Sequence, residues 1–593
     1  TIADPPYLPP IPSAAALLQS LVPTAPNPDL DPDRLPAEAA ALLPSSPLGT
    51  AYIHDPQERT DVVTAWRRHL TRHPPGHPDG TGLRGSLLSL ASDAFPYIAL
   101  WLEALRHSRA TPAHRALLST KTLGGKVKPD KHTRIIPTSA ADVTAARPLA
   151  RHPITRRLIA GIIARAVTAA SRTDYTDLCQ YGLLPSGCEA ATRRLQLHTD
   201  LRPTTLAHAS LDVENAHPTA ARLFTYLILA SHARATSRPI DLTFALYFLS
   251  YYSTATTTFI QLHASFITTL QTDGIDQGEA CAAHAHGRAI ATVIHRRLHP
   301  AVPNALSATL IHDDVTLSGF ISHHPTPPPP PAKLTPSLTP LPFAISLLAR
   351  LLLEHLRHRL AGHKTHVFQP PLPADHPQSL TTLLHLFPPS TTPTSSHIIL
   401  AGSPFGTPDG ILAALDTLLD RHTALLSRLT TIPALPPQIR LLILSLSCRP
   451  TSLFALPIRV LPPIYTTRLP LPRHSTPFAL ALRHSTLAAI AHTLRVPPGL
   501  LLHPSSDSAT AIQLLLPATD SGIGHVCPAL ISPPAYLGGL ADSLPLLLAD
   551  HILFPALTDT SSWPTSPSIS LRQAAVIFAR ITSLPTFATL SSL

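Results

Sequence analysis

The chain of 593 residues contains no methionine, only 23 glycines and only five cysteines. The cysteines are odd in number and none stand in CxxC spacing, which argues against a disulfide framework and against a zinc ribbon. Charged residues make up only 13% of the sequence, about half the usual share, whereas hydrophobic residues make up 44%. This balance argues against wholesale disorder and predicts a sizeable core, at a length that suggests about three to four domains or subdomains.

The sequence also lacks signals for export and for membrane insertion. The opening segment, TIADPPYLPPIPSAAALLQS, has neither a basic start nor an unbroken apolar stretch, so it is not expected to be a signal peptide. No run of 18 or more apolar residues occurs, so no membrane span is expected. Together with the cysteine usage, these absences predict an intracellular protein, in the nucleus or the cytoplasm, that is not secreted.

The chain has an excess of proline, with 68 residues, and of basic charge, with a formal net charge of +10. A basic balance favours polyanionic partners, among which nucleic acid comes first. Because this charge is spread thinly over a long chain, composition alone does not identify the partner.

Hydrophobic periodicity predicts a mixture of helices and strands. Apolar residues recur at helical spacing in five long segments: 61–70, 86–108, 155–171, 186–199 and 344–360. Ser186 and Glu189 have the spacing of a capping box at the start of the fourth of these helices. Strands are expected at 206–213 and 397–403, whereas 124–150 has the composition of a basic loop. The order lacks a regular alternation of strand and helix, which predicts an α+β fold.

The only Asp-Asp pair of the chain lies in the stretch SATLIHDDVTLSG. Its apolar and β-branched flanks predict the two strands of a hairpin whose tip carries Asp313 and Asp314. Taken alone, the pair can be an ordinary turn, because Asp is a common turn residue. Asp212, however, ends the strand predicted at 206–213, and neighbouring strands lie about 4.8 Å apart. If the two segments pair, the carboxylates repel one another and a divalent cation is the natural remedy.

An ordered series of short motifs then resembles the reverse transcriptases of non-LTR-like retroelements. Asp212-Val-Glu-Asn-Ala-His217 is similar to the family's D-x-x-N-A-F, and Gly274-Ile-Asp-Gln277-Gly278 to its G-x-x-Q-G. Ile311-His-Asp313-Asp314 is similar to its x-x-D-D, and Lys364-Thr-His-Val-Phe368 to its K-x-x-x-F. Further segments resemble fingers, inter-domain and C-terminal elements of the family: Lys128-Pro-Asp, Arg147-Pro-Leu-Ala, Gln180-Tyr-Gly-Leu, Gly187-Cys-Glu-Ala and Tyr536-Leu-Gly-Gly-Leu. The resemblance covers about residues 75 to 555, and the order of the motifs is more specific than any one of them.

This resemblance implies a right-hand polymerase of the α+β class, with fingers, a palm that holds an antiparallel sheet, and a helical thumb. It implies an RNA-directed DNA polymerase that adds dNTPs to a DNA or RNA primer on an RNA template, with two Mg²⁺ ions (or Mn²⁺) and no membrane. The expected regions are a Pro-rich lead-in at 1–60, fingers and palm at 61–370, a thumb-like region at 371–500 and a C-terminal region of helices and loops at 501–593. A Pro-rich insert is expected at 322–342.

The resemblance also assigns roles to individual residues. Asp212, Asp313 and Asp314 would be the catalytic metal ligands, and Lys364 would donate a proton to the leaving pyrophosphate. Residues that would contact the incoming nucleotide or the template are Lys128, Arg147, His217, Gln277 and Gly278.

Some residues depart from the family pattern and keep other interpretations open. His217 replaces an aromatic residue that discriminates sugars, so RNA-templated RNA synthesis stays open, and His312 replaces an apolar residue.

A catalytically inactive, decayed copy that only binds nucleic acid is one alternative, and an unrelated helical interaction protein is another. Singly, each aspartate can be a turn or cap residue and each cation a solvated surface charge. A zinc site at Cys281-Ala-Ala-His-Ala-His286 is not expected, since helical residues two apart diverge.

Overall fold

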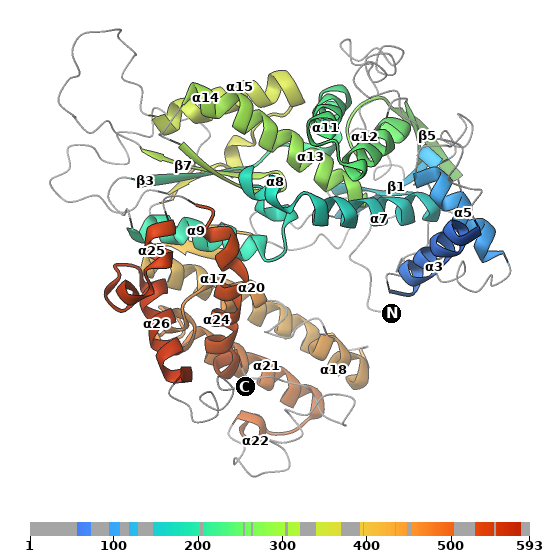
Figure 1. Cartoon of the computed structure of the whole chain (residues 1–593). Coiled ribbons are helices and arrows are strands. Elements are labelled where there is room, and N and C mark those ends of the chain that lie inside the picture. Colours follow the sequence, from blue (N-terminus) through green and yellow to red (C-terminus); the bar gives the residue numbers. More distant parts are fainter. Residues whose placement is uncertain are drawn as a thin grey trace, which may run out of the picture. The chain divides into compact units, whose positions relative to one another are not determined.

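The computed structural model shows a chain that contains both helices and sheets (Figure 1). It describes residues 56–72, 94–106, 118–127, 146–201, 206–252, 255–262, 265–302, 306–320, 340–368, 392–394, 396–432, 435–446, 454–502, 528–550 and 553–582. The chain divides into two compact units that alternate along the sequence. The first unit takes residues 1–183, 213–301 and 347–361, and the second takes 184–212, 302–346 and 362–593.

The first unit holds a four-stranded sheet in the order β2-β1-β4-β5. Strand β1 (Lys121–Val127) is antiparallel to β2 (Ala146–Arg151) and parallel to β4 (Thr256–Leu262), which in turn is antiparallel to β5 (Ser265–Gln271). The prediction of a loop over 124–150 was therefore wrong at both ends of that segment. Glycines and charged residues hide the alternation of β1, and its parallel partner lies more than a hundred residues downstream, so no local pattern marks it.

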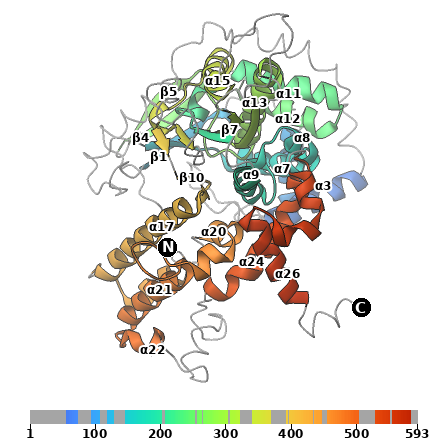
Figure 2. The same cartoon turned by 90° about the vertical axis from the view of Figure 1, so that its left-hand side faces the viewer.

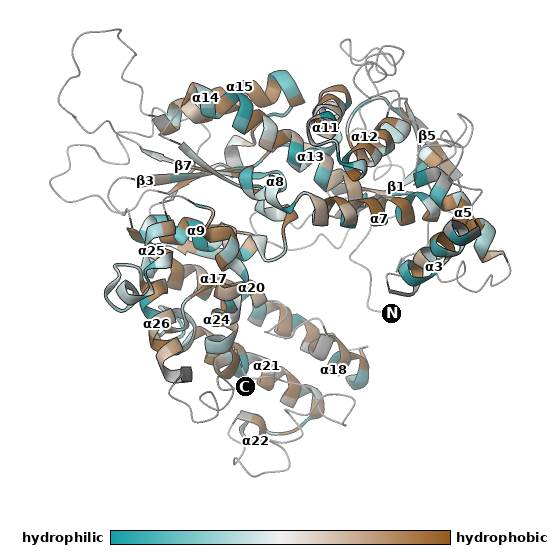
Figure 3. Ribbon diagram, viewed as in Figure 1, coloured by the Kyte–Doolittle hydropathy of each residue, from teal (hydrophilic) through white to brown (hydrophobic). Residues whose placement is uncertain are grey.

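Helices of the first unit follow the apolar periodicity closely. The helix predicted at 155–171 is confirmed as α7 (Ile154–Ala170), which buries Leu158, Ile159 and Ile163 completely or nearly so. Apolar residues predominate along α7 in Figure 3. The remaining helices of this unit are α3 (Pro56–Arg72), α5 (Phe95–Arg106), α8 (Arg172–Asp177), η3 (Tyr181–Leu183), α10 (Ala216–Thr219), α11 (Arg222–Thr236), α12 (Pro239–Tyr252), α13 (Ala280–Val293), η4 (Ile294–Leu298) and α14 (His299–Ala301). Helix α15 (Pro340–Leu356) runs from the second unit into the first.

The second unit holds a five-stranded sheet in the order β6-β7-β3-β8-β9. Strands β6 (Leu306–Ile311) and β7 (Asp314–Phe320) form the predicted hairpin, and β3 (Leu206–Leu211) pairs with β7 in antiparallel register. On its other side, β3 is antiparallel to β8 (His366–Phe368), which runs parallel to β9 (Thr392–Thr394). The strand predictions at 206–213 and around the Asp-Asp pair are confirmed.

The strand predicted at 397–403 is instead a hairpin, β10 (His397–Leu400) and β11 (Ser403–Gly406). Ala401 and Gly402 form its turn with φ of 50° and 92°, values that an extended strand excludes. Helix α17 (Pro408–Thr431) follows with a complete start signal, since the Thr407 hydroxyl accepts the Gly410 N–H at 3.2 Å and proline occupies the first turn. The other helices of this unit are α9 (Gly187–Leu201), η5 (Gly362–Lys364), α18 (Pro437–Leu446), α20 (Ala455–Val460), η7 (Ile464–Arg468), α21 (Phe478–Leu494), α22 (Pro498–Leu502), α24 (Pro528–Leu547), α25 (Phe554–Thr558), η9 (Thr560–Thr565) and α26 (Ile569–Thr582).

Helix α9 ties the sheet of the second unit to the C-terminal helices through buried arginines. Arg194 donates to the Ala308 carbonyl at 2.6 Å and to the Ser307 hydroxyl at 2.7 Å, both on β6. Its Nε also donates to Asp550 at 2.5 Å. Burial alone would raise the pKa of Asp550, but the hydrogen bond from His198 and the charge of Arg194 lower that pKa well below its usual range. The carboxylate therefore stays ionised and links α9 to the segment that follows α24.

The start of α9 differs from the capping box that the sequence predicts. Ser186 has a φ of 55°, whereas an N-cap residue is normally extended. The Glu189 carboxylate accepts from Arg459 on α20 at 2.6 Å. Arg193, the residue before Arg194, donates to the Tyr536 carbonyl on α24 at 3.0 Å, and its guanidinium lies over the Tyr536 ring. Two segments singled out by sequence, 187–190 and 536–540, thus pack together.

The close approach of α24 to α9 depends on one glycine. A Cβ at Gly539 would lie 2.9 Å from both the Arg459 carbonyl oxygen and a Glu189 carboxylate oxygen, whereas a Cβ at Gly538 would meet nothing within 4 Å.

The part of the chain that the structure describes contains no helix long and apolar enough to cross a membrane.

We predict that Gly539→Ala lowers the free energy of unfolding by about 1–3 kcal/mol, because the added methyl group overpacks the α9–α24 contact. The matched variant Gly538→Ala should leave stability unchanged or raise it by up to about 1 kcal/mol, since alanine is the better helix former. Chemical denaturation of both variants measures the difference, and equal stabilities would contradict this packing.

Candidate active site

The end of strand β3 places Asp212 between two neighbours. Ser210 pairs with Thr316 of β7 on one side and with His366 of β8 on the other. Continuing the β3–β7 ladder by two residues puts Asp212 opposite Asp314. Lys364 ends the 3₁₀ helix η5, which precedes β8, and its side chain pairs with Asp212. Residues opposite each other in antiparallel strands have Cα atoms about 4.5–5.5 Å apart. Asp212, Asp314 and Lys364 therefore lie at the same end of the sheet, where β3 ends. This end of the sheet, with Asp313 at the adjacent hairpin tip, is called the acidic edge below.

Lys364 and Asp212 form an ion pair in the structure. The side chain of Lys364 is 43% exposed and that of Asp212 is 24% exposed, so the pair lies at the surface of the unit. Exposed ion pairs contribute little to stability, typically about 0–1 kcal/mol. Nothing in the energetics of folding thus requires this pair, and both groups are accessible from solvent.

Asp313 lies at the tip of the β6–β7 hairpin. Ile311 pairs with Asp314, so His312 and Asp313 form the two-residue turn, and His312 has a φ of 56°. Such tight turns need positive φ, which makes His312 the strained position. Burial lowers the pKa of His312, although the charge of Asp313 opposes this. The imidazole is therefore neutral near pH 7 and adds no positive charge to the tip.

The beginning of α9 lies close to the same edge. Burial raises the pKa of the Cys188 thiol, and the charges of Glu189 and Asp314 raise it further. The thiol is thus protonated near neutral pH and is not a reactive thiolate. Negative charge from Asp212, Asp313 and Asp314 dominates this edge of the second unit.

The donor set at this edge has the chemistry that a hard divalent cation needs. Mg²⁺ and Mn²⁺ prefer carboxylate oxygens, and the three aspartates provide them from two segments. In this arrangement the three carboxylates do not bring one oxygen each within 4.8 Å of one another among the residues described. The Lys364 ammonium supplies the positive charge next to Asp212.

The other predicted residues belong to the first unit, where a glycine loop brings three of them together: His217, Gln277 and Gly278. Gly274 has a φ of 78°, and a Cβ there would lie 2.0 Å from the Pro218 carbonyl oxygen, so only glycine fits. The Ile275 N–H donates to the His217 carbonyl at 2.7 Å, and the Ala150 N–H of β2 donates to the Gln277 carbonyl at 2.9 Å. These bonds hold the turn at 216–219, the loop at 274–278 and β2 side by side.

This loop brings His217, Gln277 and Gly278 together with the strand that carries Arg147. The backbone of Arg147 lies in β2, opposite Lys126, but its side chain is outside the described residues. Lys128 also lies outside the described residues. The roles expected for these residues stay predictions.

His217 begins a row of histidines. Its ring centroid is 4.8 Å from that of His286, whose Nε2 is 2.7 Å from Nε2 of His358. Burial, and then the charge of His217, lower the pKa of His358 to about 3. The position where the motif of reverse transcriptases has an aromatic residue therefore carries an imidazole that lies tilted against a second imidazole. His284 does not belong to this row, because its two ring nitrogens form hydrogen bonds with the hydroxyls of Tyr175 and Thr168.

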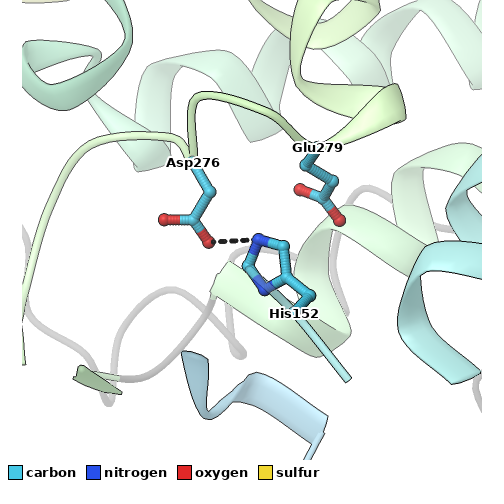
Figure 4. Close-up of side chains that lie close together, drawn as sticks. All are labelled: His152, Asp276 and Glu279. Atoms are coloured by element: carbon cyan, nitrogen blue, oxygen red, sulfur yellow. Dashed lines mark ion pairs between the residues drawn. The ribbon is translucent and has the colours of Figure 1, made fainter. Parts of the chain in front are cut away.

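A buried charged cluster behind the glycine loop was not predicted from sequence. His152, Asp276 and Glu279 bring one ligand atom each within 4.8 Å of one another, and Figure 4 shows the three side chains converging. His152 Nε2 lies 3.3 Å from Asp276 Oδ2. All three residues are buried, and Asp276 and Glu279 flank Gln277 and Gly278 in the sequence.

Two protein cations already neutralise this cluster. Lys121 of β1 pairs with Asp276, and Arg156 of α7 donates to Glu279 at 3.1 Å. Tyr247 and Tyr252 of α12 donate their hydroxyls to the same Glu279 carboxylate. Burial lowers the pKa of Lys121 to about 8 although the Asp276 charge opposes this. A metal ion would have to displace both cations, so the cluster acts as a clamp on the loop.

Charged residues in a core carry no periodic signal, which is why sequence reasoning missed the cluster. The only hint was the pair of acids next to the Q-G motif, at Asp276 and Glu279. Their partners Lys121 and Arg156 lie more than a hundred residues upstream.

We predict that Asp276→Asn lowers the free energy of unfolding by about 3–5 kcal/mol, because it leaves the buried Lys121 ammonium without its partner. The double variant Lys121→Met, Asp276→Leu should be less destabilised than Asp276→Asn, since both charges leave together. Denaturant titration of the native chain and both variants compares these losses, and a double variant that is as destabilised as Asp276→Asn would contradict the clamp.

Comparison with known proteins identifies no family for this chain. No protein-family model matches the sequence, and no curated protein matches it. Among solved structures, the chain is similar to a Sicinivirus 3Dpol RNA dependent RNA polymerase, with a TM-score of 0.32 and 14% identity over 66% of this chain and 78% of the other. It is also similar to an apo telomerase from Candida tropicalis, truncated from the C-terminal domain, with a TM-score of 0.31 and 10% identity over 52% of this chain and 59% of the other. At these TM-scores neither structure establishes a common fold.

Proposed function

We propose that the chain is a template-directed nucleotidyltransferase, an RNA-directed DNA polymerase of a retroelement that adds dNTPs to a primer 3′-hydroxyl on an RNA template. The register of β3 carries this proposal, because it gathers Asp212, Asp314 and Lys364 at one sheet edge with Asp313 at the adjacent tip. In these terms, the second unit holds the palm and the thumb-like helices, and the first holds the fingers.

Asp212, Asp313 and Asp314 would hold the Mg²⁺ ions. When bound, the ions would supply a positive field for phosphoryl transfer. The sheet contributes rigidity, since Asp212 follows a central strand paired on both sides and Asp314 begins a paired strand. Groups on strands are held more firmly than groups on loops, which favours positioned chemistry.

Lys364 has the properties of a general acid for the leaving pyrophosphate. Its ammonium group can donate a proton, and its side chain is 43% exposed, so it is able to reach a bound substrate. Its ion pair with Asp212 keeps it at the sheet edge. The three donor hydrogens of an ammonium also allow it to keep Asp212 as a partner while it faces a phosphate.

The glycine loop would serve the nucleotide and the template. Gly278 has a φ of 103° and gives the backbone a close approach that a side chain would block. His217, held by its carbonyl to the same loop, would contact the sugar. An imidazole is smaller than a phenyl or phenol ring, so discrimination between dNTPs and NTPs is the property most open to change.

An inactive copy that only binds nucleic acid is the second candidate. Two observations favour it. The ion pair with Lys364 neutralises one of the three carboxylates, and among the residues described the three do not bring one oxygen each within 4.8 Å of one another. Activity assays separate the two candidates.

We expect the native chain to extend a primer on an RNA template with dNTPs and Mg²⁺, and Asp313→Asn to slow extension by about 10²–10³-fold, since metal charge stabilisation is worth several kcal/mol. Asp61→Asn, an exposed aspartate of α3, is the matched control and should keep native activity. Equal extension by the native chain and Asp313→Asn would reject the mechanism, and extension by neither would favour the inactive copy.

Lys364→Met should lower kcat by about 10²–10⁴-fold, the usual worth of a general acid, with primer–template affinity unchanged. Lys364→Arg keeps the positive charge beside Asp212 but cannot donate its proton, so it should be as slow as Lys364→Met. Single-turnover kinetics with both variants test this role. Recovery of activity in Lys364→Arg would show that the residue only balances the charge of Asp212.

A further inference from the structure

A cavity in the first unit lies apart from every residue assigned above. Its volume is about 230 Å³, and it lies among α8, α11, α13 and η4. Helices α8, α11 and α13 are neighbours in Figure 1 and in the turned view of Figure 2. The polar residues of its lining are Asp174, Asp177, His232, Arg288, Thr292 and Arg296.

One wall of the cavity is a column of hydrogen-bond donors. Arg288, Thr292 and Arg296 follow one another at intervals of four residues along α13 and η4, and all three line the cavity. Side chains at this spacing lie on one helix face. Two guanidinium groups with a hydroxyl between them are suited to an oxyanion, because guanidinium forks bind phosphate oxygens in pairs.

Arg288 is rigidly placed within this column. It is 2% exposed, and its guanidinium carbon lies 4.8 Å from the centre of the Tyr175 ring. Its Nη2 is buried and has no hydrogen-bond partner among the residues described. The nearest carboxylate oxygen, Oδ2 of Asp174, is 3.7 Å away. A buried charged donor without an acceptor costs free energy, so the site is built to receive one.

Asp174 does not meet this need, because other cations hold it. Its Oδ2 accepts from Arg238 and lies 3.2 Å from Nε2 of His232. Arg238 is itself fixed by Asp241 at 2.6 Å and by the Ala170 carbonyl at 2.5 Å. Several cations therefore share the Asp174 carboxylate, and the Nη2 of Arg288, a residue that lines the cavity, makes no hydrogen bond among the residues described.

Two carboxylates also line the cavity. Asp174 lies beside Arg288, and Asp177 is exposed at the surface. Carboxylates repel a bare oxyanion but accept hydrogen bonds from hydroxyl groups. The cavity is also smaller than the roughly 300–1,000 Å³ of sites for drug-sized molecules. These features fit a small ligand that carries hydroxyl groups as well as a phosphate.

We propose that this cavity is a binding site for a small phosphate monoester that carries hydroxyl groups, such as a sugar phosphate. The phosphate contacts Arg288, Thr292 and Arg296, and the hydroxyls donate to Asp174 and Asp177. The site is independent of nucleotidyl transfer, because none of its residues belongs to the acidic edge or to the glycine loop.

Isothermal titration calorimetry with ribose 5-phosphate tests the site without any need for polymerase activity. The native chain should bind ribose 5-phosphate more tightly than inorganic phosphate and should not bind ribose. Arg296→Gln should weaken binding by about tenfold or more, since a charged hydrogen bond contributes about 1.5–3 kcal/mol. Arg296 is exposed, so this variant should fold normally.

Arg297→Gln is the matched control, because Arg297 is the exposed neighbour that does not line the cavity and its loss changes the net charge equally. It should bind like the native chain, and Thr292→Val should bind several-fold more weakly. Absence of binding by the native chain, equal losses in Arg296→Gln and Arg297→Gln, or equal affinity for inorganic phosphate and ribose 5-phosphate would each overturn the proposal.

Discussion

The register of β3 is the constraint on which the acidic edge depends. The strand is paired on both sides, so its position along β7 and β8 fixes what stands beside its last residue. A slip by one residue would turn every side chain of β3 to the other face and would bury polar groups in the core. Ala207, Ala209 and Leu211 are buried within that core, which makes the slip costly. The place of Asp212 is thus set by packing.

Helix α9 packs against the sheet and stabilises the register of β3 through hydrogen bonds. His208 of β3 is bonded to Thr199 of α9 at 3.0 Å and to Ser318 of β7 at 2.8 Å. Burial lowers the pKa of His208 to about 3, so it is a neutral polar link between helix and sheet. Buried polar networks that are fully satisfied specify one arrangement of a core. The first unit uses the same device, with Lys121 and Arg156 clamping the loop that carries Gln277.

The sequence predicted those parts of the fold that rest on local periodicity. Helix α7 and the hairpin around Asp313 follow from the spacing of apolar residues alone. Strand β1 could not be predicted, because its parallel partner β4 lies far along the chain and Lys121 is a charged residue in a buried position. The same limit applies to the site. The order of motifs singled out Asp212, Asp313, Asp314 and Lys364, whereas the ion pair between Asp212 and Lys364 depends on a register that no motif encodes.

The central claim is that three carboxylates at one sheet edge bind a divalent cation. Titration with Mn²⁺, followed by electron paramagnetic resonance of the free ion, tests it without substrates. The native chain should remove Mn²⁺ from solution, Asp212→Asn should do so much more weakly, and Asp61→Asn, at the exposed aspartate of α3, should behave like the native chain. Undiminished Mn²⁺ binding by Asp212→Asn would contradict the account.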